Sequence, residues 1–228
     1  MGAYPLGVIV VIGSPIGRST DGPIAAGGPA SRVALAAARA RRAVQLVGRT
    51  GDDATADAIV LDLALGGVGH VALLRDPARQ TPLEPVLREE DEAGDPADDT
   101  DPMVVPPHAA AAEGPTLDAA DVDLGLRYLT DVDVVVLAEP AGPEIVAIVA
   151  EAARWGEARL ILVVGAGESV PADLPPDAIV FEAPDADPDG VFATLVGTFA
   201  AALDDGSDPA EAFRASVATD GWTGSPAD

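Results

Sequence analysis

Two carboxylates that come directly before a helix are the residues of this chain best suited to chemistry. Asp187 and Asp189 precede Gly190 and an apolar helix expected over 192–203. A carboxylate can act as a base or hold Mg²⁺, and the first N–H groups of a helix attract anions because they lack partners within it. Asp187 and Asp189 are therefore candidate catalytic residues, and Gly190 is a candidate cofactor-binding residue. The plainer alternative is that the two acids only cap the helix and stabilise its dipole.

Two pairs of glycines could lie against a ligand. Gly27 and Gly28 allow the backbone to approach a substrate closely, or they only permit a tight turn before a helix. Gly165 and Gly167 follow a buried strand and could accept the phosphate of a cofactor. Without a lysine this second motif is weak, and plain turn glycines are the alternative.

Three polar residues are further candidates for binding a substrate. Arg18 and Arg32 could hold an anionic group through bidentate contacts, or they could form solvated or salt-bridged side chains. Thr81 is a candidate substrate-facing residue, although a threonine in a strand needs no such role. The only histidines, His70 and His108, have no visible partner, and the chain has no cysteine, so we predict no metal site.

The charge of the chain excludes several kinds of partner. Its 228 residues include 38 acids and 13 basic residues, all of them arginine, which gives a formal net charge of −25. Such a charge repels nucleic acid and anionic membrane surfaces. No apolar run is long enough to span a bilayer. We therefore expect a cytoplasmic protein that binds neither nucleic acid nor membrane, and a homodimer on general grounds.

Apolar runs that alternate with helical patterns must position these residues. Runs at 6–12, 132–137 and 160–164 indicate strands buried on both faces, and the helical patterns between them predict a doubly wound, mostly parallel α/β sheet flanked by helices. Ligands of such sheets lie at the carboxyl ends of the strands. This rule brings four segments to one rim, namely 13–28, 139–140, 165–167 and 187–193.

Smaller elements and boundaries complete the expected organisation. Ser31 is expected to cap a helix over 32–41, and 81–87 is expected to form a further strand. We predict one domain over 1–219, with a mobile acidic loop near 89–101 that carries too much charge to order itself. The tail over 220–228 is expected to be loose.

The order and spacing of several motifs resemble the PfkB, or ribokinase-like, carbohydrate kinases. The motifs are Gly27-Gly-Pro-Ala-Ser-Arg-Val-Ala34, Val47-Gly-Arg-Thr-Gly-Asp-Asp53, Leu162-Val-Val-Gly-Ala-Gly167, and closing helices at 197–203 and 206–213. The resemblance covers most of the chain. It implies a ribokinase-like fold, a sugar or nucleoside-like ligand, and ATP and Mg²⁺ as cofactors if the chain is active.

The same resemblance implies that the phosphoryl-transfer chemistry has been removed. On one alignment the family's catalytic Asp falls at Ala193, and Val191 and Phe192 replace residues that leave room for phosphate. On a second alignment Pro184-Asp-Ala-Asp187 matches the family's Asn-Glu-x-x-Glu region, and the catalytic segment would lie beyond the given residues. On either alignment no Asp occupies the base position. The family's sugar-binding Asp and Asn fall at Arg18 and Arg32. Too few residues lie between Arg18 and the double glycine for the strands of the family's usual lid, so we expect the lid to be reduced or absent.

Three functions remain open at this point. The first is a catalytically degenerate kinase-like protein that keeps a ligand-binding or interaction role. The second is an active, divergent sugar or nucleoside kinase in which Asp187 or Asp189 supplies the base. The third, from outside the family, is a nucleotide-binding regulatory protein, suggested only by Gly165 and Gly167.

Overall fold

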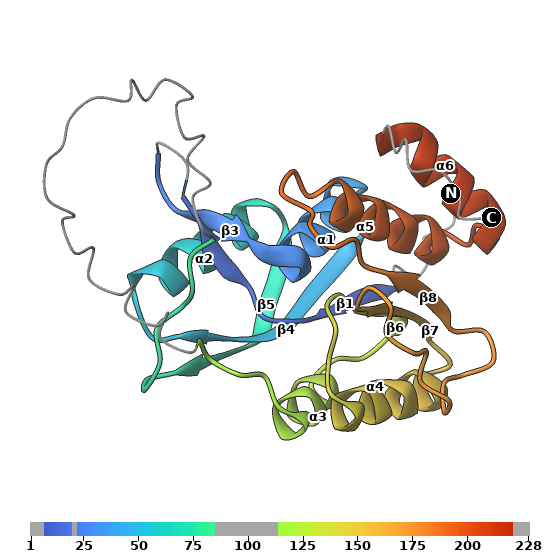
Figure 1. Ribbon diagram of the computed structural model, residues 1–228, viewed down its shortest axis with the longest axis horizontal. Coiled ribbons are helices and arrows are strands. Elements are labelled where there is room, and N and C mark those ends of the chain that lie inside the picture. The colour runs from blue at the N-terminus through green and yellow to red at the C-terminus, as the bar shows by residue number, and fades with distance from the viewer. Residues whose placement is uncertain (1–6, 20–21, 85–113, 221–228) are drawn as a thin grey trace, which may run out of the picture.

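Six parallel strands form one sheet with helices on both faces (Figure 1). The computed structural model describes residues 7–19, 22–84 and 114–220. The sheet has the strand order β5-β4-β1-β6-β7-β8, with β1 (Val8–Ile12), β4 (Ala43–Gly51), β5 (Val68–Asp76), β6 (Val132–Leu137), β7 (Arg159–Val164) and β8 (Ile179–Glu182). This arrangement confirms the predicted doubly wound α/β sheet. The expectations for the acidic loop at 89–101, for His108 and for the tail beyond Asp220 lie outside the described residues.

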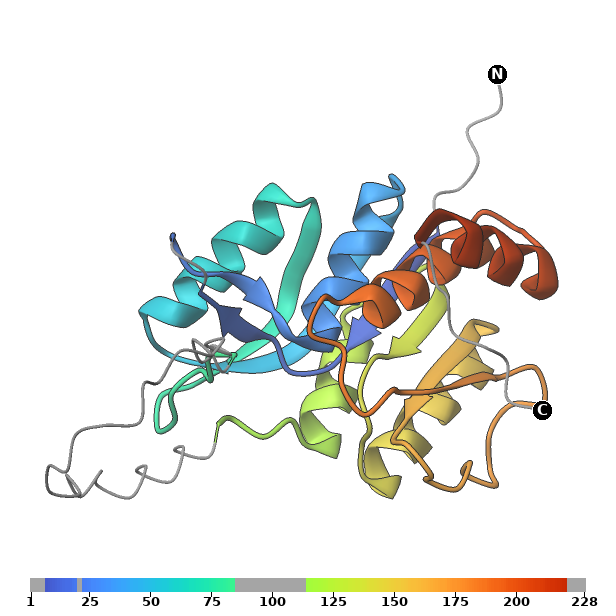
Figure 2. The ribbon, with the colours of Figure 1, turned by 45° about the horizontal axis from the view of Figure 1, so that its top comes forward.

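The helices divide into two layers. Figures 1 and 2 show α1 (Gly28–Arg39), α2 (Ala54–Leu65), α5 (Val191–Asp204) and α6 (Pro209–Asp220) on one side, and α3 (Ala119–Arg127) and α4 (Pro143–Gly156) on the other. None of the described helices combines the length and the hydrophobicity needed to cross a membrane.

The central strand β1 supplies side chains to both layers. Ile9 and Val11 pack into the core under α1 and α5, whereas Val10 and Ile12 pack into the core above α3 and α4. All four side chains are fully buried. Because successive side chains of a strand point to opposite faces, a continuous apolar run is what a strand between two helical layers requires.

The chain reverses its direction of travel across the sheet at β1. Strands β4 and β5 follow on one side of β1, and β6, β7 and β8 follow on the other. The crevice for a ligand in such a sheet lies at this switch point, beyond the carboxyl ends of the two strands. Here those ends are Gly13-Ser14 after β1 and Ala138-Glu139 after β6.

Three local expectations were wrong. Helix α1 begins at Gly28 rather than at Arg32, because Pro29 suits the first turn of a helix, where its missing N–H costs nothing. Ser31 therefore lies inside the helix, fully buried, and does not cap it. Of the strand predicted over 81–87, the described residues 81–84 form only an isolated bridge between Leu83 and Gly17, and 85–87 lie outside the described residues.

A short ribbon occupies the place expected for a reduced lid. Strands β2 (Ile16–Arg18) and β3 (Ala25–Gly27) pair antiparallel, so this stretch does hold two strands, each of three residues. The ribbon contacts the helix layer through α2, because the Ala26 N–H donates a 2.8 Å hydrogen bond to the Asp62 carboxylate.

Helices α1 and α5 pack closely because Gly197 has no side chain. A Cβ added to Gly197 would lie 2.4 Å from the carbonyl oxygen of Val33 and 2.7 Å from the Cβ of Ala36. Both distances are far below van der Waals contact, so the helices could accept a side chain here only by moving apart.

We predict that Gly197→Ala destabilises the protein although alanine is the better helix former. The gain in helix propensity is about 1 kcal/mol, whereas overpacking a core costs about 1–3 kcal/mol. The control is Gly156→Ala, since a Cβ at Gly156 in α4 would meet no atom within 4 Å. Urea unfolding should show a lower free energy of unfolding for Gly197→Ala and an equal or higher one for Gly156→Ala. Equal effects of the two changes would contradict the proposed contact.

Candidate functional site

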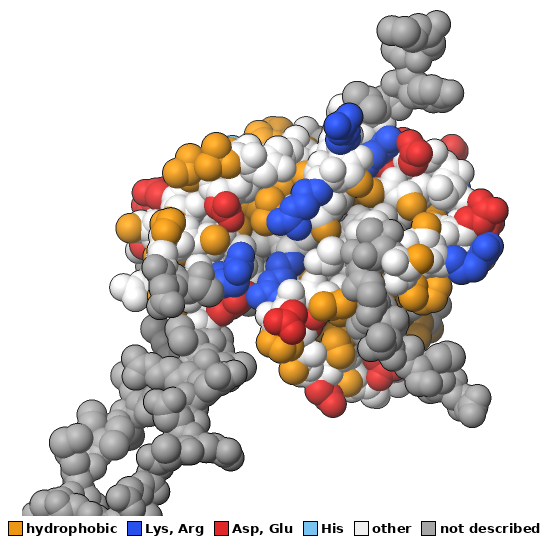
Figure 3. Space-filling view, turned by 90° about the horizontal axis from the view of Figure 1, so that it is seen from above, with side chains coloured by type: hydrophobic (Ala, Val, Ile, Leu, Met, Phe, Trp, Pro, Cys, Tyr) orange, Lys and Arg blue, Asp and Glu red, His pale blue; other side chains and the backbone are white. Residues whose placement is uncertain are grey.

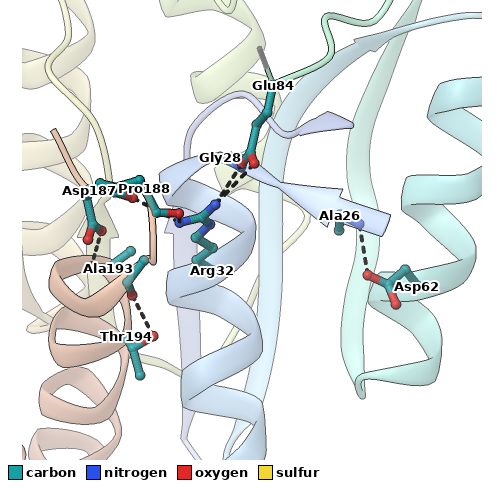
Figure 4. Close-up of polar contacts among 10 residues, drawn as sticks. Ala26, Gly28, Arg32, Asp62, Glu84, Asp187, Pro188, Ala193 and Thr194 are labelled. Atoms are coloured by element: carbon teal, nitrogen blue, oxygen red, sulfur yellow. Dashed lines mark hydrogen bonds and ion pairs between the residues drawn. The ribbon is translucent and has the colours of Figure 1, made fainter. Parts of the chain in front are cut away.

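Arg32 joins the starts of two helices on the rim of the sheet (Figure 4). Its Nη1 donates hydrogen bonds of 3.0 Å to the backbone oxygens of Asp187 and Pro188, ahead of α5. Its Nη2 donates to both carboxylate oxygens of Glu84, at 3.0 and 3.1 Å. The Arg32 side chain is only 17% exposed. From the sequence, this guanidinium was a candidate for binding an anionic ligand. In the structure both Nη atoms donate to oxygens of the protein itself.

The Asp187 carboxylate occupies the N–H groups at the start of α5. One of its oxygens accepts from the Phe192 N–H at 3.1 Å and the other from the Ala193 N–H at 3.0 Å. These are the amides that were expected to face an anion. Ala193, which the resemblance aligned with the family's base, is 2% exposed. The structure thus places Asp187 as a cap of α5, and its assignment as a catalytic base stays a prediction.

Gly190 is the residue that lets Arg32 come this close. It has a φ of +71°, in the left-handed region that favours glycine. A Cβ at Gly190 would lie 2.6 Å from both Cδ and Nη1 of Arg32. Gly190 therefore contacts a protein side chain where a cofactor had been expected.

The double glycine at the start of α1 receives a second internal carboxylate. The Gly28 N–H donates a 2.8 Å hydrogen bond to Oε1 of Glu84, the same oxygen that Arg32 contacts. A Cβ at Gly27 would come within 2.6 Å of this oxygen. The close approach expected at the two glycines is therefore present, and the group that approaches is Glu84.

Thr81 lies in a separate group of hydrogen bonds. Its hydroxyl accepts from the Gly51 N–H at 2.9 Å, and its own N–H donates to the Asp53 carboxylate at 2.7 Å. Asp53 also caps α2 through the Ala56 N–H. Burial would raise the pKa of Asp53, but these N–H groups bind the ionised form and lower the pKa below its ordinary value. Thr81 is 6% exposed and joins the end of β4 to the start of α2.

The remaining candidate residues are of two kinds: two have backbone amides that already donate hydrogen bonds within the protein, and two have exposed side chains. The Gly165 N–H donates to Glu168 at 3.0 Å and the Gly167 N–H donates to Glu182 at 2.7 Å, so both amides of this turn hold carboxylates of the chain. Arg18, on β2, and Asp189 are exposed. The structure thus brings Gly27, Gly28, Arg32, Asp187 and Gly190 together, and leaves Thr81, Gly165 and Gly167 in other hydrogen-bond groups.

Glu139 was placed on the rim from the sequence but was not assigned a role there. It follows β6 at the switch point and lines a cavity of about 290 Å³ together with Gly13, Ser14, Thr116, Gly142 and Ile145. Its Oε1 accepts a 2.7 Å hydrogen bond from the Ser14 N–H. Burial raises the pKa of Glu139, and the hydrogen bond from Ser14 opposes this only in part. The strand order of the structure adds that Glu139 lies at the reversal beside β1, which the sequence alone does not give.

The arginines of the α1, α2, α5 and α6 face stand in separate groups among acidic and apolar side chains (Figure 3). Within the described part of the chain, no cluster of three or more His, Asp or Glu side chains could hold a metal ion. The site is therefore a rim of backbone amides and acids.

Comparison with known proteins identifies the architecture. No protein-family model matches the chain, and no curated protein sequence matches it. Among solved structures, a ribokinase from Arabidopsis thaliana in complex with ribose and ATP aligns over 96% of this chain and 94% of its own, with a TM-score of 0.62 and 16% identity. The chain has the ribokinase-like fold.

Two further structures with this fold agree. A ribokinase II from E. coli, in complex with ATP and Mg²⁺, aligns over 94% of this chain and 91% of its own, with a TM-score of 0.60 and 12% identity. A ribokinase from Agrobacterium tumefaciens aligns over 92% and 88%, with a TM-score of 0.56 and 17% identity. All three structures are 17% identical to the chain or less, so they establish its architecture alone.

We expect the two acids before α5 to differ sharply in their effect on stability. Asp187→Ala leaves the Phe192 and Ala193 N–H groups without their acceptor and should lower the free energy of unfolding by about 1–2 kcal/mol. Asp189→Ala removes an exposed carboxylate from the same turn and should change it by less than about 0.5 kcal/mol. Chemical unfolding followed by circular dichroism measures both. A large loss in Asp189→Ala alone would show that the cap has been misassigned.

The raised pKa of Glu139 makes a prediction about pH. A carboxyl whose pKa is higher in the folded than in the unfolded state stabilises the fold below its unfolded pKa, and this contribution is lost as pH rises through the folded pKa. Glu139→Gln keeps an acceptor for the Ser14 N–H and removes the titration. The variant should therefore gain stability relative to wild type as pH rises above about 4.5, measured by urea unfolding at a series of pH values. If the difference in the free energy of unfolding between the variant and wild type stays constant with pH, the pKa of Glu139 is not raised by burial.

Proposed function

We propose that this chain binds a small polyhydroxylated ligand, of sugar or nucleoside type, at the cavity beside Glu139, and that it does not transfer phosphate. The fold supports the class of ligand, since the Arabidopsis ribokinase with the same fold is complexed with ribose. The Glu139 carboxylate and the Thr116 hydroxyl, which both line the cavity, are suitable partners for hydroxyl groups. The cavity beside Glu139 provides a concave place for them at the switch point of the sheet.

The observation that carries the second half of the proposal is the hydrogen bonding of Asp187. Transfer of a phosphoryl group depends on positioning it and on neutralising its charge. The two amides at the start of α5 donate to Asp187 instead, and Arg32 is paired with Glu84. No titratable side chain stands at Ala193. The fit of the phosphates of ATP to these residues is therefore poor, because a triphosphate would meet carboxylates where it needs donors.

Titration calorimetry with pentoses, hexoses and nucleosides, with and without ATP and Mg²⁺, tests the proposal. We expect at least one of these ligands to bind in the calorimeter. In a separate assay with ATP and Mg²⁺, we expect the release of ADP to stay at background. Glu139→Gln should weaken this binding, whereas Glu151→Gln, which removes an exposed charge from α4, should not.

Other outcomes would favour the alternatives. ATP-dependent phosphorylation that Asp189→Asn or Asp187→Asn abolishes would establish the active kinase and overturn the proposal. Tight binding of a nucleotide without any sugar would instead support the nucleotide-binding regulator. Failure of every sugar and nucleoside to bind would remove the proposed ligand class.

A further inference from the structure

A second and larger cavity lies on the α4 side of the sheet. Its volume is about 530 Å³, which is within the usual range for small-molecule sites. The segment 165–173, which follows β7, runs beside α4 (Figure 2) and is tied to it by a hydrogen bond from Arg154 to the Asp173 carbonyl oxygen. The walls are mainly apolar and are formed by residues of α4, of β7 and of this segment, including Val146, Ala147, Leu162, Val164, Pro171 and Ala172.

The charged side chains that line this cavity are both acidic. Glu168 and Asp173 line it, and no Arg or His is among its lining residues. Arg154 reaches Asp173 only at the backbone oxygen, and no hydrogen bond or ion pair from a described residue reaches the Asp173 carboxylate. No aromatic ring lines the walls, so the two carboxylates are the groups that would select the charge of a ligand.

The backbone at the mouth of the cavity does not favour an anion. The amides of Gly165 and Gly167, which could have received a phosphate, already hold Glu168 and Glu182. The start of α4 contributes the positive end of a helix dipole, but this amounts to about half a charge, and Pro143 in its first turn has no N–H to offer. Two full negative charges outweigh it, and the formal net charge of −25 adds to them.

We propose that this cavity binds an organic cation, an amine or guanidinium group carried on an apolar body. The apolar body would lie against Val146, Leu162 and Pro171, and the cationic group would lie at the mouth between Glu168 and Asp173. This site is distinct from the rim around Glu139, although Pro140 and Ala141 border both cavities. It makes no use of sugar binding, so the two proposals can fail separately.

Three molecules of the same shape and different charge test the class of ligand. We would titrate 2-phenylethylamine, 2-phenylethanol and phenylacetate into the isotope-labelled protein and follow the amide shifts of residues 143–147 and 165–173 by NMR. The amine should bind at this site at least about tenfold more tightly than the alcohol, and phenylacetate should not bind. Added salt should weaken binding of the amine, because its charge is attracted by partly exposed carboxylates.

Conservative variants locate the charge. Glu168→Gln and Asp173→Asn keep the shape of the mouth and should each reduce the affinity for the amine severalfold. Glu151→Gln removes an acid from α4 outside the cavity and should leave it unchanged. The proposal is overturned if the alcohol binds as tightly as the amine, if phenylacetate or ATP shifts the same amides more strongly, or if no amine binds. Loss of amine binding in Ala147→Trp, which should fill the cavity, would support the assignment, and unchanged binding in that variant would refute it.

Discussion

The rim of this protein depends on one guanidinium group. Arg32 is largely buried, and a buried charge destabilises a fold unless it is paired and hydrogen-bonded. Glu84 supplies the opposite charge, and the carbonyl oxygens of Asp187 and Pro188 accept two further bonds. Glu84 also accepts a hydrogen bond from the start of α1, and Asp187 accepts one from the start of α5. Arg32 therefore connects the starts of these two helices.

Hydrogen bonds from backbone N–H groups to acidic side chains occur at several places along the carboxyl edge of the sheet. Backbone N–H groups of Ser14, Gly28, Gly165, Gly167 and Ala193 each donate to an acidic side chain of the chain itself. A tethered carboxylate is present at a high effective concentration, whereas a free anion must arrive from solution. In a chain with a formal charge of −25, anions are also repelled over long distances. These amides are therefore already occupied by carboxylates of the same chain.

Sequence patterns predicted the sheet because its inner strands β1, β6 and β7 are buried on both faces. The run 132–137 contains β-branched and apolar residues with one acid, and the structure forms β6 over the same residues. The site was less accessible to prediction, since its contacts join residues far apart in the chain: 125 positions separate Ser14 from Glu139, and 155 separate Arg32 from Asp187. The sequence could indicate which residues reach the rim, but it could not indicate which donors are already taken. Local rules also compete, as at Ser31, where the proline two residues earlier decided the start of the helix.

The ribbon of β2 and β3 has a consequence for how fast a ligand could enter or leave. Gly17 exchanges backbone hydrogen bonds with Pro82 and Glu84, at 2.8 and 2.7 Å, and Ala26 is tied to α2 through Asp62. Movement of the ribbon away from its neighbours would break these hydrogen bonds, so they oppose such a movement. Entry then needs no closing step, so association can approach the rate set by diffusion and orientation. The residence time of a ligand would then depend on its own contacts with the protein, and a bound ligand would remain accessible to solvent.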